Sequence, residues 1–165
     1  MTRITIIASG PELVGGRVRS FDGVFVDLMR GARQELQFAS YYMMPQRLVF
    51  SELEAAVRRG VKTVIILNRF WGQSAVTKRF LCRLLKYKNL LLYSFEKSGS
   101  DLHAKVIVSD RSTAIIGSAN LSFHGMYINY EIGIQVTGEY AWEVAKLIDT
   151  IASLSKPVTC KGTSS

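Results

Sequence analysis

Apolar runs typical of buried strands alternate with amphipathic helical segments along most of this chain. In the clearest instance SELEAAVRRG, residues 51–60, is followed directly by VKTVIIL, residues 61–67. Ser51 and Glu54 have the spacing of a capping box, and a glycine stands where the helix would end. The run after it is rich in β-branched residues, which favour strands. With the buried strand predicted over 35–43, these segments predict a β-α-β unit.

The same alternation extends over the rest of the chain. Helices are predicted from a cap at Ser20 to about Arg33, over 74–87 and over 139–154, and strands over 90–95, 102–109, 113–118 and 129–136. In the last helix the residues expected to face the core are Trp142, Ala145, Ile148 and Ile151. The pattern predicts an α/β fold in which a mixed β-sheet carries helices on both faces.

The length fits one domain, predicted over residues 1–155, and the last segment, 156–165, reads as a disordered tail. Cys82 and Cys160 form no CxxC pair, so we expect two free thiols. The apolar patch near the N-terminus is too short to span a membrane and lacks the layout of a secretory signal. These features favour a cytoplasmic protein without stable membrane association.

The chain is basic. Its 21 Lys and Arg residues against 13 Asp and Glu residues give a formal net charge of +8. Such a charge favours polyanionic partners, of which nucleic acid and an acidic membrane surface are the obvious kinds. The alternative is an ordinary soluble protein that happens to be basic.

Three predicted strands each present one polar side. Because side chains alternate along a strand, His103 and Lys105 share a face, as do Ser118 and Asn120 at the end of the next strand. On the strand after that, Glu131 lies on the polar side. Together these groups suit a phosphodiester: an imidazole can attack phosphorus, while an ammonium, a hydroxyl and an amide hold the non-bridging oxygens. Glu131 could orient the imidazole by accepting its other N–H.

The spacing H-x-K-x4-D-x6-G-S-x-N closely resembles the HKD motif of the phospholipase D superfamily. Here the motif is filled by His103, Lys105, Asp110, Gly117, Ser118 and Asn120. The resemblance implies a phospholipase D/nuclease-like fold and metal-independent hydrolysis or transfer of a phosphodiester through a phosphohistidine, with no cofactor. It also places Glu131 where small nucleases of the superfamily keep the carboxylate that supports the histidine.

Members of the superfamily use two such motifs for each active site, and this chain has one. His124, the other histidine, has no lysine two positions later. The resemblance therefore implies a homodimer in which His103 of one subunit attacks and His103 of the other protonates the leaving group. Twofold dimers are the commonest oligomers.

Several of these residues have ordinary explanations. Lys105 could protect a strand edge from aggregation, and Asp110 suits a turn, so we expect a structural or orienting role for Asp110 within the candidate site. A metal could instead be held by Asp101, His103, Asp110 and Glu131. That arrangement would set Lys105 beside the cation, which is repulsive, so we predict no metal.

A weaker binding signal lies in NRFWGQS, residues 68–74, which follows a predicted strand. Loops in this position often line the binding crevice of an α/β protein. Arg69 and Trp71 could combine a phosphate contact with base stacking. Equally, Phe70 and Trp71 could pack in the core or against a second subunit.

The function predicted from these observations is a metal-independent endonuclease that cleaves DNA or RNA. One alternative is a phospholipid-cleaving enzyme, but the sequence shows no long amphipathic anchor outside the predicted core helices. The other is a catalytically weak nucleic-acid-binding module, which would be expected to lack a motif residue.

Overall fold

A computed structural model describes residues 1–160, which form a single layered α/β unit. The helices are α1 (Phe21–Gly31), α2 (Arg47–Arg58), α3 (Ala75–Leu84) and α4 (Glu139–Ser153), with short helical segments η1 (Phe70–Gly72) and η2 (His124–Ile128). The strands are β1 (Arg3–Ser9), β2 (Arg19–Ser20), β3 (Glu35–Ser40), β4 (Lys62–Asn68), β5 (Leu90–Phe95), β6 (Lys105–Ser109), β7 (Thr113–Gly117), β8 (Glu131–Thr137) and β9 (Lys156–Pro157).

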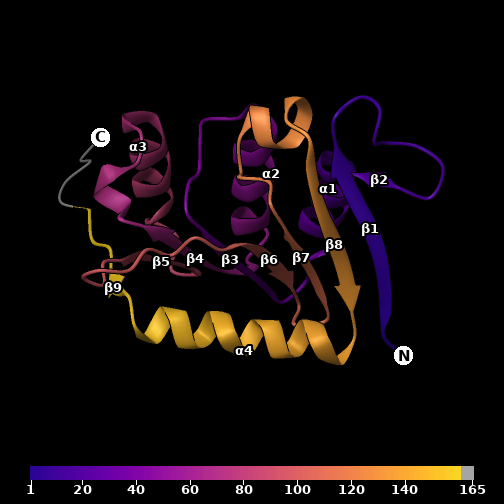
Figure 1. Cartoon of the computed structure of the whole chain (residues 1–165). Coiled ribbons are helices and arrows are strands. Elements are labelled where there is room, and N and C mark those ends of the chain that lie inside the picture. The colour runs from indigo at the N-terminus through magenta and orange to yellow at the C-terminus, as the bar shows by residue number, and fades with distance from the viewer. Residues whose placement is uncertain (161–165) are drawn as a thin grey trace.

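The strands of this part of the chain form one nine-stranded sheet in the order β2-β1-β8-β7-β6-β3-β4-β5-β9. Strands β3, β4 and β5 are parallel, as short helical crossovers require, whereas β6, β7 and β8 form antiparallel neighbours. Helices α1, α2 and α3 cover one face of the sheet and α4 covers the other (Figure 1). The predicted mixed sheet with helices on both faces is therefore confirmed.

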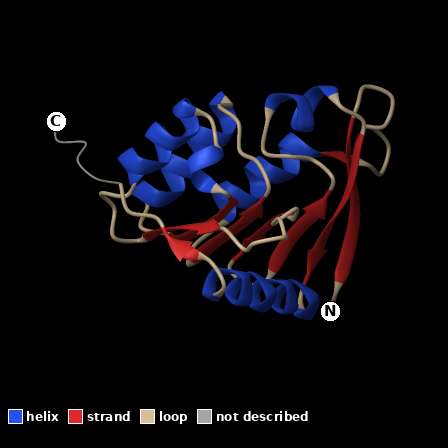
Figure 2. Ribbon diagram, turned by 60° about the vertical axis from the view of Figure 1, so that its left-hand side comes forward, coloured by secondary structure: helices blue, strands red, loops and turns tan. Residues whose placement is uncertain are grey.

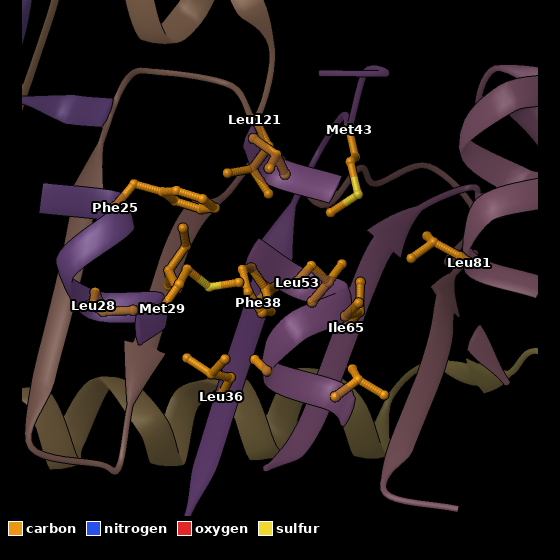
Figure 3. Packing of buried hydrophobic residues seen from close by; sticks show 14 of the residues in the cluster. Phe25, Leu28, Met29, Leu36, Phe38, Met43, Leu53, Ile65, Leu81 and Leu121 are labelled. Carbon is orange, nitrogen blue, oxygen red and sulfur yellow. The ribbon is translucent and has the colours of Figure 1, made fainter. Parts of the chain in front are cut away.

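The larger core lies between the sheet and the three-helix layer. Leu36, Phe38 and Ile65 of the central strands are fully buried there, and they meet Met29 of α1 and Leu53 of α2 (Figure 3). A smaller cluster lies between the sheet and α4, which runs beneath the strands in Figure 2. Within residues 1–160 no helix is long and apolar enough to cross a bilayer.

Helix α1 begins as predicted, because Ser20 Oγ accepts a hydrogen bond from the Gly23 backbone N–H. The prediction for α2 is wrong at its start. This helix begins at Arg47 rather than Ser51, and Gln46 caps it by accepting a 2.6 Å hydrogen bond from Val49 N–H. Ser51 instead bonds back to a carbonyl within the helix. A long amide side chain thus replaces the expected capping box.

Two further features differ from the sequence-based expectations. Trp142 does not face the core; 48% of the residue is exposed, and the buried residues of α4 are Ala141, Ala145 and Ile148. The apolar patch near the N-terminus, for which no strand is predicted, forms β1 beside β8.

The C-terminal segment is ordered further than predicted. Lys156 and Pro157 pair with β5, and Val158 is buried. Cys160 forms a disulfide with Cys82 of α3, so the prediction of two free thiols is wrong. The two cysteines are 78 positions apart in the sequence, so their spacing did not indicate a disulfide. Their Cα atoms are 5.7 Å apart only because the folded chain places α3 beside the C-terminal segment. The rest of the predicted tail, 161–165, lies outside the described residues.

Candidate active site

The candidate site lies at one end of the central antiparallel strands. The start of β6, the end of β7 and the start of β8 meet there, because Val106 pairs with Ile116 and Gly117 pairs with Gly133. Both glycines are needed for this approach, since a Cβ added to Gly117 would lie 3.0 Å from the Gly133 Cα. The strand register therefore brings the two halves of the motif together.

His103 lies just before β6, so the strand begins three residues later than the predicted position 102. The backbone remains tied to the sheet there, because Tyr41 N–H donates to the Ala104 carbonyl over 3.0 Å. The His103 ring is exposed, and its centroid lies 5.0 Å from that of the Tyr41 ring. The imidazole is thus supported on one side and open on the other.

The Lys105 ammonium lies beside this imidazole. Its Nζ is 3.4 Å from His103 Nδ1 and donates to the His103 carbonyl oxygen at 3.2 Å. Partial burial lowers the pKa of Lys105, although the Glu131 carboxylate acts in the opposite direction. No ion pair to Lys105 occurs within residues 1–160, so the charge remains free for an anionic ligand.

Ser118 and Glu131 are directly hydrogen-bonded across the β7–β8 pair. Ser118 Oγ donates to Glu131 Oε2, and Asn129 Nδ2 donates to Glu131 Oε1 over 3.2 Å. Within residues 1–160 the Glu131 carboxylate accepts from Ser118 and Asn129, and no hydrogen bond joins it to His103. In the structure Glu131 positions the hydroxyl rather than the histidine.

Asn120 follows β7 and faces the same region. It lines a small cavity together with Lys105 and Ser40. Its Oδ1 is buried and has no hydrogen-bond partner among the residues that the structure describes. The loop is pinned to the segment after β3 by a 3.0 Å hydrogen bond from Met44 N–H to the Leu121 carbonyl. Asn120 therefore stands next to Lys105 on a fixed loop.

Asp110 is the motif residue that the structure does not bring to this site. It stands at the other end of β6, about 16 Å from Lys105 at the usual rise per residue. Its carboxylate accepts hydrogen bonds from the backbone N–H groups of Arg33, Gln34 and Glu35 over 2.8–3.2 Å. The structural role expected for Asp110 fits this position, whereas its place among the catalytic candidates does not.

Arg69 directly precedes η1, and Trp71 lies within it. Arg69 is close to the segment before His103. Arg69 Nε is 3.2 Å from Asp101 Oδ1, and hydrogen bonds from Asn68 and Arg69 lower the pKa of Asp101. Trp71 is 55% exposed and packs edge-on against the buried Phe70. Arg69 lines a cleft that reaches the His103 region through Tyr41; Trp71 is not among the residues that line it.

The other histidine and the alternative metal site receive no support from this geometry. His124 begins η2 and packs edge-on against Phe123, with ring centroids 6.0 Å apart. The proposed metal set would need Asp110, which lies at the far end of β6. Within residues 1–160 no three His, Cys, Asp or Glu side chains gather as metal ligands would.

Sequence reasoning missed Tyr41, which supports the His103 ring. The pattern predicts a buried strand over 35–43, but β3 ends at Ser40 and the chain then turns across the end of β6. A tyrosine directly after a buried strand is a usable signal, because ligand-binding residues often follow strand ends. The contact itself depends on the antiparallel β3–β6 pairing, which the pattern did not reveal.

The model of the family described as "Cardiolipin synthase, PLD-like domain" matches residues 25–153, which is most of the chain. The chain belongs to this family. The match includes all the motif residues from His103 to Asn120, and it confirms membership of the phospholipase D superfamily.

The chain is similar to individual proteins in sequence and in structure. Cardiolipin synthase A of Wigglesworthia glossinidia brevipalpis is 29% identical over 160 residues, which are 94% of this chain but 31% of that protein. This chain thus spans about a third of the length of that synthase. Among solved structures, the phospholipase D family member Nuc from Salmonella typhimurium has a TM-score of 0.80 and 16% identity, with 97% of this chain and 100% of that chain covered.

NucT from Helicobacter pylori is similar to the same extent, with a TM-score of 0.78 and 18% identity over 96% of this chain and 100% of NucT. At these identities the two structures establish the fold alone. They confirm the predicted phospholipase D/nuclease-like architecture over nearly the whole chain.

Proposed function

We propose that this protein cleaves phosphodiesters without a metal ion, and that nucleic acid is its substrate. The observation that carries the proposal is the meeting of His103, Lys105, Ser118 and Asn120 at one end of the sheet. They supply a nucleophile and three kinds of donor for the oxygens of a phosphate. The superfamily to which the chain belongs consists of enzymes that cleave or transfer phosphodiesters, which agrees with this chemistry.

The reaction would run in two displacements. An imidazole nitrogen of His103 bonds to phosphorus while the bond from phosphorus to the leaving oxygen breaks, and a second, protonated imidazole gives its proton to that oxygen. Water then attacks phosphorus, its proton passes to the second imidazole and the P–N bond breaks. Lys105 and Asn120 hold the non-bridging oxygens throughout, and Ser118 is fixed by Glu131 for the same purpose.

The second imidazole would come from another copy of the chain. Attack and protonation occur on opposite sides of phosphorus, so one imidazole cannot perform both. His124, whose ring packs edge-on against Phe123, has no lysine two positions later and so does not supply a second motif. An apolar surface suited to a dimer lies on the α4 side of β1 and β8, where Ile4, Ile6 and Ile132 are 50–64% exposed. Exposed apolar patches of this kind mark interaction surfaces.

Nucleic acid is favoured as the substrate by the charge of +8, because each neutralised backbone phosphate contributes to affinity.

The second candidate is a phospholipid. The family description and several relatives carry the name cardiolipin synthase, and an alcohol in place of water would turn the same two displacements into a transfer. We expect the protein itself to act in the cytoplasm, where nucleic acid is found. The Cys82–Cys160 disulfide is unusual for that location, because disulfides are rare in reducing compartments.

An activity panel in EDTA tests the proposed function. Plasmid, single-stranded DNA, RNA and phosphatidylglycerol vesicles would be incubated with the wild-type protein and with His103→Gln. We expect chelator-resistant cleavage of nucleic acid by the wild type alone. Turnover confined to the vesicles would favour the phospholipid candidate, and a strict need for added Mg²⁺ would refute the metal-free mechanism.

Sedimentation and turnover, both measured at decreasing protein concentration, test the shared site. Sedimentation gives the fraction of dimer, and we expect turnover per chain to fall as the dimer dissociates, because each site needs two His103 side chains. Changing Ile4, Ile6 and Ile132 together to Ser should shift the equilibrium toward monomer. Leu147→Ser is the control, because Leu147 is also exposed and apolar but lies on α4, outside this surface. A monomer with full turnover would rule out the shared site.

A further inference from the structure

A second feature of the candidate site is a cleft beside His103 that the phosphate chemistry does not use. The cleft has a volume of about 230 Å³ and is lined by Tyr41, Tyr42, Asn68, Arg69, Gly72 and Gln73. Tyr41 belongs to both places, because its ring centroid is 5.0 Å from that of His103. Whatever occupies the cleft therefore lies next to the reacting phosphate.

The two walls of the cleft are fixed to each other by a buried side chain. Gln73 is 6% exposed, and its Nε2 donates to the Tyr41 carbonyl at 3.1 Å and to the Asn68 carbonyl at 2.8 Å. Its Oε1 accepts from Met43 N–H at 3.2 Å. One amide thus spans the segment after β3 and the segment after β4, so the cleft is formed before any ligand arrives.

The floor beneath His103 is tied to the same wall. Asn68 Oδ1 accepts a 2.9 Å hydrogen bond from Leu102 N–H, and Asn68 Nδ2 donates to Asp101 Oδ1 at 3.1 Å. Arg69 reaches the same carboxylate oxygen from a left-handed backbone conformation, with φ of 45°. A left-handed conformation is uncommon for arginine and indicates that the loop is held in place.

The exposed surface of this cleft is aromatic and cationic. Tyr41 is 37% exposed, the Arg69 side chain is 56% exposed, and Gly72 leaves the backbone open between them. Tyrosine rings and guanidinium groups bind flat π-systems by stacking. The glycerol headgroup of phosphatidylglycerol has no such ring, whereas the base of a nucleotide is one.

We propose that the cleft bounded by Tyr41, Tyr42 and Arg69 binds an unpaired nucleobase next to the phosphate held at His103 and Lys105. A base stacked on a tyrosine cannot remain stacked and paired in a duplex. The substrate class is therefore single-stranded nucleic acid. This inference rests on the proposed function and narrows it, and it assigns a binding role to two tyrosines outside the motif.

Equilibrium binding tests this proposal without turnover. The protein would carry His103→Gln, which removes the nucleophile, and its affinity would be measured for a labelled oligothymidylate of about eight residues, an abasic oligonucleotide of equal length and charge, and a DNA duplex. Stacking of one base is worth about 5- to 150-fold in affinity. We expect oligothymidylate to bind more tightly than the abasic strand by a factor in this range, and more tightly than the duplex.

The tyrosine variants locate the effect. Tyr41→Leu and Tyr42→Leu, separately and together, should bring the affinity for oligothymidylate down to that for the abasic strand. Tyr41→Phe and Tyr42→Phe should preserve the difference, and Tyr140→Leu, an exposed tyrosine on α4, should not change it. Equal affinity for the two strands, a preference for the duplex, or a difference that survives in the double Leu variant would each overturn the cleft assignment. The first two of these outcomes require no change in the cleft and therefore do not depend on whether the Leu variants fold.

A diester without a base separates this inference from the proposed function. Cleavage of the abasic oligonucleotide by the wild-type protein in EDTA needs His103 and Lys105 but not the cleft, because this strand carries no aromatic ring. Its absence would refute the phosphodiesterase while the binding comparison stands. Its presence together with equal affinity for the two strands would refute only the cleft.

Discussion

The two ends of β6 carry residues of one motif, yet they are built in opposite ways. At the starting end, His103 is exposed and Lys105 has no ion-pair partner within residues 1–160. At the far end, the Asp110 carboxylate accepts hydrogen bonds from three backbone N–H groups. One end keeps its polar groups available for a ligand, and the other uses them to hold the chain.

Arg111 extends the satisfied end. It donates to Glu35 Oε2 over 2.7 Å and pairs with Asp149 of α4 over 2.7 Å, and Gln37 donates to the same aspartate. Hydrogen bonds from Arg111 lower the pKa of Asp149 below its usual value. A motif residue can thus stabilise the fold instead of contacting a ligand. We therefore expect substitutions at the starting end of β6 to lower turnover and substitutions at the far end to lower stability.

The largest expected effect belongs to His103→Gln. The loss of a nucleophile typically removes on the order of 10⁶ in turnover. Because the ring is exposed, we expect the melting temperature to stay within about two degrees of the wild type. Turnover in EDTA and thermal unfolding measure the two effects, and an active His103→Gln protein would exclude this residue as the nucleophile.

Lys105→Met should cost on the order of 10²–10³ in turnover, or about 3–4 kcal/mol, as the loss of one oxyanion donor does. The charged form holds the phosphate, and burial lowers the pKa of Lys105. As pH rises, activity should therefore begin to fall at a pH below the ordinary lysine pKa of about 10.4, because Lys105 loses its charge there. A pH–rate profile that stays flat to that pH, or one unchanged in Lys105→Met, would contradict the role.

Loss of the disulfide should affect stability and leave the site intact. Closing a loop of this length is worth about 4 kcal/mol in the chain-entropy model. Cys160→Ala should lower the free energy of unfolding by about that amount, and a reducing agent should do the same to the wild type only. Denaturant titration measures the loss. Turnover that changed in parallel would show that this edge of the sheet is coupled to the site.

Asp110→Gly should cost about 3 kcal/mol of stability, since hydrogen bonds to a charged group are worth up to that much. Glycine suits the backbone at this position, where φ is 50°, so Asp110→Ala is the control that adds strain. Partial burial would raise the pKa of Asp110, but the hydrogen bonds from Glu35, Gln34 and Arg33 outweigh it and lower the pKa.

The sign of the pH effect follows from that lowered pKa. The contribution of Asp110 is present above the unfolded pKa of about 3.9 and is lost as pH falls through the folded value. The stability of wild type and Asp110→Gly should therefore converge in acid. A constant gap in unfolding free energy down to the lowest pH would show that the carboxylate charge is not responsible.

The part of the site that depends on local pattern could be predicted from the sequence. Alternation along the strands placed His103 beside Lys105, and the resemblance to the motif added Ser118, Asn120 and Glu131 to the same site. The hydrogen bond from Ser118 to Glu131 could not be predicted, because it depends on the register of β7 and β8. For the same reason the disulfide and the Tyr41 contact were missed, since both join segments that only the folded sheet brings together.

The most direct test of the account is to compare His103→Gln with Asp110→Gly in the same two assays. Chelator-resistant turnover per folded molecule and the free energy of unfolding would be measured for both proteins and the wild type. We expect His103→Gln to lose turnover and keep its stability, whereas Asp110→Gly should lose stability and keep its turnover. Loss of turnover in folded Asp110→Gly, or wild-type turnover in His103→Gln, would contradict it.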